Sequence, residues 1–195
     1  MAANSSAVLA LAAALVMAGA PGASAAKKKV AAHPAPVKRE AAKKEPPANA
    51  KPTLVATFGD WGTYEAQGPK SKICYALAQP KQRTPAALKR DAAYIFISSR
   101  PGEGIHNEVS VMMGVPLKDG ATDAKAEVGA AAFDLVTKGQ NAWMRNAAQE
   151  SQLIDAMKKH GRLVVKAPVA KGSVADSYSL AGLGQALERV SKDCP

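Results

Sequence analysis

Two cysteines, Cys74 and Cys194, carry the clearest chemistry in this chain of 195 residues. They are 120 positions apart, and neither belongs to a Cys-x-x-Cys motif or has a histidine near it in the sequence. This arrangement disfavours a redox or metal site. In an oxidising compartment two such cysteines pair by default, so a Cys74–Cys194 disulfide is predicted. The alternative is two free, buried thiols.

The histidines and acidic residues offer one metal-like cluster, which is His106 with Glu103 and Glu108. The cluster falls on a segment rich in proline and glycine, and such a segment is more typical of a solvated turn than of a metal site. His33 lies in a basic stretch, and His160 ends a predicted helix, where a cation is favourable. No metal ligands are predicted.

Catalytic residues are equally sparse in the sequence. Asp176 and Tyr178 could form an acid/base pair, but an Asp in a turn beside a Tyr in a strand is commonplace. Gly182 and Gly184 are similar to the start of a dinucleotide-binding loop, but Leu187 occupies the place of the third glycine. The sequence contains no Gly-x-Ser-x-Gly, His-Glu-x-x-His or Walker motif. We therefore predict no catalytic residues, no cofactor and a protein that is not an enzyme.

A stretch rich in Lys, Ala and Pro spans residues 26–53. It holds eight of the 26 Lys and Arg residues but two of the 16 acidic ones, which gives it a net charge of +6 out of +10. Because it has few apolar side chains to bury, a disordered linker is predicted. Its cations would bind polyanions, or the stretch would act as a solvated spacer. The predicted polyanion-binding residues are Lys27, Lys28, Lys29, Lys38, Arg39, Lys43, Lys44 and Lys51.

Residues 1–25 read as a signal peptide. An apolar run from Ala7 to Ala20 is followed by Pro21-Gly22 and by the small residues Ala23-Ser24-Ala25, which are typical of a cleavage site after Ala25 or Ala26. The run is shorter than the roughly 20 apolar residues of a transmembrane anchor. The mature protein is predicted to be periplasmic or secreted and not to span a membrane. Export also argues against nucleic acid as a partner.

The remaining residues, 54–195, are predicted to form one domain, because they suffice for a hydrophobic core. Short apolar or alternating runs separated by turns predict strands at residues 53–58, 72–78, 93–99, 107–113 and 141–144. Residues 125–128 and 131–136 are expected to form two short strands or one bulged strand. Residues 149–159 predict a helix, and residues 81–90 a loop. Many short strands with turns every eight to twelve residues favour a mainly β fold, an antiparallel, immunoglobulin-like β-sandwich with one or two short helices.

The segment from Arg162 to Val190 is predicted to organise the core. It begins with a strand at residues 163–165, turns at residues 170–173 and forms a second strand at residues 177–180. Ser179 is then predicted to cap a C-terminal helix with apolar residues at spacings of three and four. Earlier in the chain, Trp61 is predicted to be a core aromatic whose indole N–H donates to a carbonyl group.

The order of these signals resembles the invasion-associated locus B family of bacterial exported proteins. The resemblance rests mainly on Phe58-Gly-Asp-Trp61, Lys72-Ile-Cys-Tyr-Ala-Leu-Ala-Gln-Pro80, Ser99-Arg-Pro101, Asn107-Glu-Val-Ser-Val111, Leu163-Val-Val-Lys166 and Asp176-Ser-Tyr-Ser-Leu-Ala-Gly-Leu183. It implies a periplasmic or surface-exposed β-sandwich and, in some members, a role in bacterial entry into host cells. It implies no catalytic residue and no cofactor. Many members carry a further cysteine soon after the Trp, where this chain has Tyr64 and Glu65.

The sequence as a whole predicts an exported, non-enzymatic envelope or surface interaction protein, with virulence among its expected roles. Its partner is an unknown protein or an envelope polyanion such as peptidoglycan or anionic lipid head groups. One alternative is a periplasmic envelope-maintenance protein whose basic stretch binds polyanions. Another is a hydrolase with an unrecognised site.

Overall fold

The structure is a computed structural model that describes residues 51–195. The predicted signal peptide, most of the predicted linker and seven of the eight predicted polyanion-binding residues lie outside the described residues. Lys51 is the member of that set that the structure describes, and its side chain is exposed.

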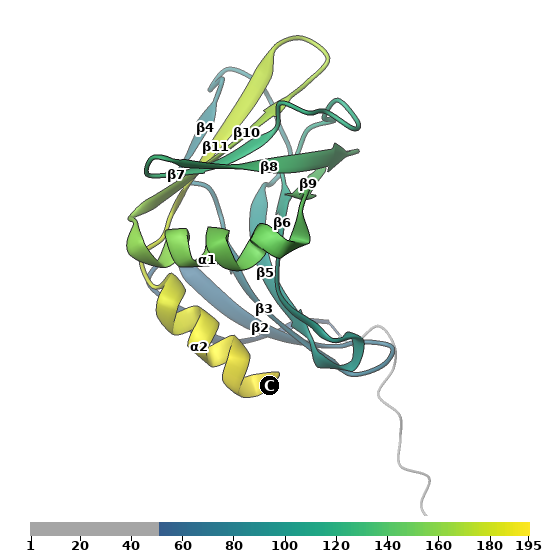
Figure 1. Cartoon of the computed structure of the whole chain (residues 1–195), viewed down its shortest axis with the longest axis vertical. Helices are drawn as coiled ribbons and strands as arrows, with labels where there is room; N and C mark the ends of the chain where they lie inside the picture. Colours follow the sequence, from purple (N-terminus) through teal and green to yellow (C-terminus); the bar gives the residue numbers. More distant parts are fainter. Residues whose placement is uncertain (1–50) are drawn as a thin grey trace, which may run out of the picture. The chain divides into compact units, whose positions relative to one another are not determined.

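Eleven strands and two α-helices make up the described part of the chain (Figure 1). The strands are β1 (Thr53–Phe58), β2 (Trp61–Gln67), β3 (Lys72–Ala78), β4 (Gln82–Thr84), β5 (Tyr94–Arg100), β6 (Ile105–Met112), β7 (Lys125–Val128), β8 (Ala131–Lys138), β9 (Asn141–Met144), β10 (Arg162–Pro168) and β11 (Ser173–Ser179). The helices are α1 (Glu150–Lys159) and α2 (Leu183–Asp193). Short 3-10 turns at Pro101–Glu103 and Ala147–Gln149 complete the elements.

All strand pairs are antiparallel, and the strands follow the order β1-β2-β3-β5-β6-β9-β8-β7-β10-β11-β4 in one open sheet. The predicted mainly antiparallel β fold is therefore confirmed, and so are two short helices with one at the C-terminal end. The immunoglobulin-like sandwich of two facing sheets is not confirmed. The physical reason lies in β8, whose first half pairs with β7 and whose second half pairs with β9. This strand joins the two groups of strands into a continuous ladder.

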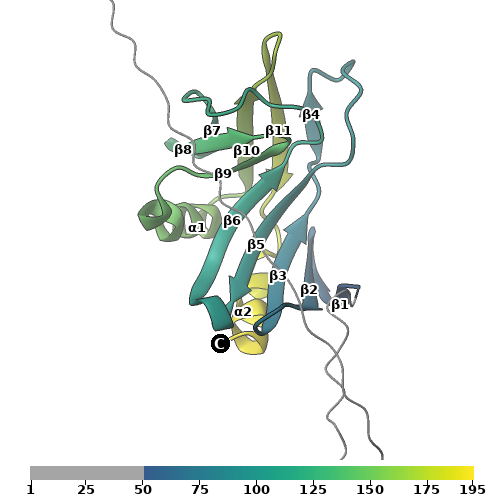
Figure 2. The same cartoon turned by 90° about the vertical axis from the view of Figure 1, so that its right-hand side faces the viewer.

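The hydrophobic core lies on the face of the sheet that the helices cover. Along β5, Ile95, Ile97 and Ser99 are buried, whereas the residues between them are partly exposed, as the period of two in a strand requires. α2 packs on β1, β2, β3 and β5, and α1 packs against β6 and β7. In Figure 2, β3 and β5 lie in front of α2, so their other face is turned to the viewer. Among residues 51–195, neither helix is long and apolar enough to cross a membrane.

Four details of the sequence-based assignment were wrong. β2 lies between the strands expected at residues 53–58 and 72–78, where no strand was expected, and β4 occupies part of the loop expected at residues 81–90. β11 begins at Ser173, within an expected turn, because seven residue pairs with β10 extend it. α2 begins at Leu183 after Gly182, and Ser179 does not cap it, because Leu180 donates its N–H to Gly161 instead of starting the helix.

Candidate functional site

The turn between β1 and β2 is held against the start of α2 by three backbone features. Asp60 donates its N–H to the carbonyl oxygen of Ala181 over 3.1 Å. Gly59 and Gly182, on the two sides of this contact, both have positive φ angles, 54° and 89°. The turn is therefore fixed by residues more than a hundred positions away. This rigidity matters because the turn forms one end of a surface hollow.

Trp61 anchors the same turn from the inside. Its side chain is fully buried, and its indole N–H donates to the carbonyl oxygen of Ser179 over 3.1 Å. The sequence-based prediction of a core aromatic with a carbonyl partner is thus confirmed. Since side chains alternate along a strand, burial of Trp61 and Thr63 turns Gly62 and Tyr64 to the opposite face of the sheet.

A hollow of about 390 Å³ lies on that opposite face. Its floor is at Gly62, where a Cβ atom would lie 2.9 Å from the Tyr64 ring and 3.3 Å from the Leu54 side chain. Leu54 and Tyr64 therefore form apolar walls that a side chain at position 62 would crowd, and Leu77 also lines the hollow. Leu54 is 52% exposed, which is unusual for a large aliphatic side chain in a strand of this sheet. The hollow combines accessible apolar walls with a backbone floor.

The polar end of the hollow is an ion pair between Asp60 and Lys81. The Lys81 Nζ atom lies 2.5 Å from Asp60 Oδ1. The hydrogen bond from Lys81, followed by one from the Ser179 side chain, lowers the pKa of Asp60 below its usual value. Asp60 is therefore a carboxylate over most of the pH range, and Lys81 and Asp60 present charges of both signs at the rim. Thr57 and Gln79 add a hydroxyl and an amide to this end of the hollow.

A row of aromatic rings continues from the hollow across the outer face of the sheet. The rings of Tyr64 and Tyr75 stack with centroids 5.3 Å apart, Tyr75 packs on Phe96 at 5.9 Å, and Phe96 packs on Tyr94 at 6.0 Å. All four side chains are partly exposed. Partial burial, and to a smaller extent the neighbouring Tyr64, raises the pKa of Tyr75, so its hydroxyl stays neutral. The row makes this side of β2, β3 and β5 an amphipathic surface.

Two further hollows follow in a chain, one beside the hollow over Gly62 and the other beside that neighbour. The first of them, of about 300 Å³, shares Lys81 with the hollow over Gly62 and includes Gln82, Arg162, Ser177 and Ser179. The second, of about 380 Å³, shares Gly161 and Arg162 with its neighbour and includes His160 and Glu127. The sequence analysis did not single out Tyr64, Lys81 or Arg162 as binding residues. No sequence signal could have done so, because the three come together through the pairing of distant strands.

Cys74 and Cys194 lie at disulfide distance, with Cα atoms 5.9 Å apart, as the sequence predicts. Both are buried, Cys74 in β3 and Cys194 just after α2. The pair links the end of the C-terminal helix to β3. It lies on the covered face and does not line the hollow over Gly62.

Asp176 and Tyr178, the acid/base pair weighed from the sequence, are both fully buried on the same face of β11. Asp176 Oδ1 lies 2.7 Å from Arg90 Nη2 and 3.5 Å from Arg83 Nε. Burial raises the pKa of Asp176, and the charge of Arg90 opposes that rise. Burial also raises the pKa of Tyr178. Because both side chains are fully buried, the arrangement is a buried ion-pair cluster.

The other residues considered for chemistry have structural partners. Arg100 lies 3.0 Å from Glu103 and 2.9 Å from Glu108, so both carboxylates of the metal-like cluster are engaged by a cation. Gly182 and Gly184 open α2, and Gly182 packs against the β1–β2 turn. His160 follows α1, and its ring lies against Gly129.

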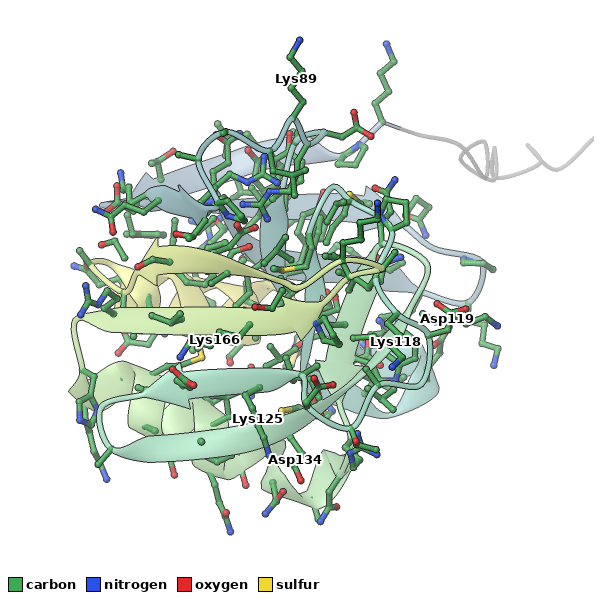
Figure 3. The ribbon with its side chains drawn as sticks, turned by 90° about the horizontal axis from the view of Figure 1, so that it is seen from above. Lys89, Lys118, Asp119, Lys125, Asp134 and Lys166 are labelled. Atoms are coloured by element: carbon green, nitrogen blue, oxygen red, sulfur yellow. A yellow bond between two sulfur atoms is a disulfide. The ribbon has the colours of Figure 1, made fainter. Side chains whose placement is uncertain are left out.

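Charged side chains on the outer face of β7, β8 and β10 form pairs across the strands. Lys125 is paired with Asp134, and Lys166 Nζ lies 2.8 Å from Glu127. Figure 3 labels Lys125 and Asp134, which point toward each other from β7 and β8, and Lys166 on β10. These pairs make the outer face of the sheet charged near β7, whereas the same face carries aromatic side chains near β2 and β3.

Comparisons with protein-family models, with curated proteins and with solved structures give no match to this chain. The resemblance to the invasion-associated locus B family therefore stays a prediction from the sequence.

Proposed function

We propose that this chain is an exported, non-enzymatic envelope or surface interaction protein of the invasion-associated locus B type, and that it binds its partner through the outer face of the sheet. The observation that carries the proposal is the hollow over Gly62, which exposes Leu54 and Tyr64 beside the Asp60–Lys81 pair. Accessible apolar surface with a polar rim is characteristic of interaction sites. A role in contact with host cells belongs to the same proposal.

The disulfide-distance pair supports the export part of the proposal. Cysteines at this separation persist as a disulfide in a periplasm or outside the cell, whereas the cytosol keeps thiols reduced. Together with the signal-like residues 1–25, the pair favours maturation outside the cytosol.

The positions of the segments that carry the family resemblance also support the proposal. Phe58-Gly-Asp-Trp61 and Asp176-Ser-Tyr-Ser-Leu-Ala-Gly-Leu183 are distant in sequence but meet at the Asp60–Ala181 and Trp61–Ser179 hydrogen bonds. Motifs that together form one contact between the β1–β2 turn and the start of α2 are expected to meet in this way.

A pull-down with matched leucine variants tests the proposal. The full exported chain is incubated with isolated envelope fractions and with host-cell membranes, and Leu54→Glu is compared with Leu88→Glu. Both leucines are largely exposed, at 52% and 40%, but only Leu54 lines the hollow. Leu54→Glu should weaken binding about tenfold, because it places a charge on an apolar wall, and Leu88→Glu should leave binding unchanged. Equal binding by the two variants, or no binding by the parent chain, contradicts the proposal.

Deleting residues 26–50 separates the proposal from the envelope-maintenance alternative. If the basic stretch makes the contact, deletion abolishes the pull-down and salt weakens it steeply. If the sheet makes the contact, binding survives deletion. A hydrolase screen addresses the remaining alternative, since turnover that one point substitution abolishes would overturn the non-enzymatic function.

A further inference from the structure

β1 is a free edge of the sheet. Within residues 51–195 the strand order ends at β1 on one side and at β4 on the other, and β1 pairs with β2 alone. In Figure 2, β1 lies beyond β2 at the end of its group of strands. Ala56 directs its carbonyl oxygen toward β2, because that oxygen accepts a hydrogen bond from Thr63 Oγ1 over 3.3 Å. Backbone groups alternate in direction along an antiparallel strand, so the N–H and carbonyl groups of Thr57 point away from β2 and can pair with a further strand.

The two edges differ in how well they are protected against further pairing. β4 has three residues, contains Arg83 and lies between Pro80 and Pro85. Short length, charge and proline all oppose the addition of a strand. β1 has six residues, Thr-Leu-Val-Ala-Thr-Phe, without a charge or a proline. A segment of this length and composition is a template for pairing with another strand. We therefore expect a further strand to cover β1.

A bulge just after Leu54 makes β1 nearly symmetric about its own centre. Because the bulge inserts one residue, Leu54 and Thr57 both line the hollow over Gly62, although they are three positions apart. Lys51 precedes Leu54 by three positions, and Asp60 follows Thr57 by three. In an antiparallel pair of two β1 strands centred on the bulge, Leu54 of each copy lies beside Thr57 of the other. The same pairing brings Lys51 of each copy toward Asp60 of the other, whereas a parallel pairing would place equal charges side by side.

We propose that two copies of this chain associate by antiparallel pairing of their β1 strands. The copies are related by a two-fold axis that passes through the bulge perpendicular to the sheet, which gives a closed and self-complementary interface. Such an axis keeps the outer faces of both sheets on the same side. The two hollows therefore open on one face of the joined sheet, and Leu54 of the second copy adjoins Thr57 of the first. The opposite charges of Lys51 and Asp60 favour a second copy over an unrelated extended peptide. This inference goes beyond the proposed function, because it concerns a contact between copies and requires no envelope partner.

Sedimentation equilibrium of the full exported chain over a range of concentrations tests this inference. One pair of strands buries little area, so the parent should form dimers at high concentration and dissociate on dilution. Leu54→Glu/Thr57→Glu should weaken dimerisation about tenfold or more, and so should Leu54→Lys/Thr57→Lys, because like charges then face one another across the strand pair. An equimolar mixture of the two variants should dimerise again, because opposite charges then meet. This rescue also shows that both variants are folded.

Leu88→Glu is the matched control, because it places the same charge on an exposed leucine outside β1. It should dimerise as the parent does, and so should a chain without residues 26–50. Loss of dimerisation on that deletion would assign the contact to the basic stretch and would overturn the inference. A parent that stays monomeric at the highest soluble concentration, or a mixture of the two charged variants that does not dimerise, would also overturn it.

Hydrogen exchange separates strand pairing from other contacts between copies. Exchange of the Thr57 amide should slow as the dimer forms, because its N–H gains an acceptor, and unchanged exchange in the dimer would contradict strand pairing. Binding of envelope material is measured separately. If a monomeric parent still binds envelope material through Leu54, the inference fails and the proposed function stands. If dimers form but Leu54→Glu binds envelope material as the parent does, the proposed function fails and the inference stands.

Discussion

Gly182 packs against the carbonyl group of Phe58 so closely that a Cβ atom on Gly182 would lie 2.0 Å from that oxygen. The reverse contact is also tight, since a Cβ atom on Gly59 would lie 2.6 Å from the Ala181 carbonyl oxygen. The backbone of the β1–β2 turn and the backbone that precedes α2 therefore touch directly. This contact holds Asp60 at the rim of the hollow and lets α2 start where it can reach β3.

Replacing Gly182 by Ala should destabilise the fold by about 2 kcal/mol or more, because the residue has φ 89° and no space for a methyl group. Gly184→Ala is the control. Nothing lies within 4 Å of a Cβ atom on Gly184, and alanine favours a helix, so this variant should be neutral or more stable. Urea unfolding of both variants measures the difference. Equal stabilities would show that the close contact has no energetic role.

Reduction of the Cys74–Cys194 pair should lower the free energy of unfolding by up to about 4–5 kcal/mol, since the bond closes a loop of about 120 residues. The measurement is urea unfolding with and without reductant. The double variant Cys74→Ala/Cys194→Ala should be as unstable as the reduced parent and should not respond to reductant. A parent chain that is equally stable in both conditions would argue that the bond is not formed in solution.

Asp176→Asn should destabilise the protein by about 3–5 kcal/mol, because it leaves the guanidinium group of Arg90 buried without an anion. Arg83 keeps two other partners, the carbonyl oxygens of Asp91 and Met113, each 2.8 Å away. Asp134→Asn removes an exposed carboxylate paired with Lys125 and should cause no measurable loss. Thermal unfolding compares the two variants, and a loss of similar size in both would contradict the buried ion pair as a stabilising contact.

The carboxyl group of Glu150 is expected to make the free energy of unfolding depend on pH. Its Oε1 atom accepts the N–H of Val109 over 2.8 Å, and burial raises the pKa of its carboxyl group above the usual value. Because the folded protein then holds the proton more tightly than the unfolded chain, this group's contribution to stability is full at low pH. It falls as pH rises through the unfolded and then the folded pKa.

Glu150→Gln keeps an oxygen acceptor for Val109 but cannot ionise. The stability of this variant relative to the parent should therefore increase with pH across that window and level off above it. Unfolding free energies measured in urea from acid to neutral pH give the curve. Glu188→Gln, an exposed position on α2, controls for the loss of one negative charge. A relative stability of Glu150→Gln that does not change with pH would contradict the raised pKa.

Several strands could be predicted from the sequence because their local pattern agrees with their final burial. β3 and β7 begin and end at the expected residues, and each end of β5 lies one residue from its expected position. β-branched or alternating apolar side chains favour strands at these places. α1 is similar, because three apolar residues lie on one face and two lysines end it. The same logic predicted a buried Trp61.

Other elements have no such pattern. β2 contains Gly62, which weakens a strand by itself but leaves room here for the Tyr64 ring. β4 has three polar residues and exists because Gln82, Arg83 and Thr84 pair with β11. The binding surface shares this origin. Leu54, Lys81 and Arg162 belong to separate parts of the chain, and their neighbourhood follows from strand order alone.

The sequence by itself determined the antiparallel β class and the C-terminal helix, and it predicted the pairing of Cys74 with Cys194 over the alternative of two free thiols. These follow from local periodicity and from the number of cysteines, which are properties of neighbouring residues or of composition. The tertiary structure alone decided that eleven strands form one open sheet, that Asp176 is sealed beside Arg90, and that three hollows meet at Lys81 and Arg162. Each of these depends on contacts between residues far apart in the chain, and local sequence preferences carry no information about such contacts.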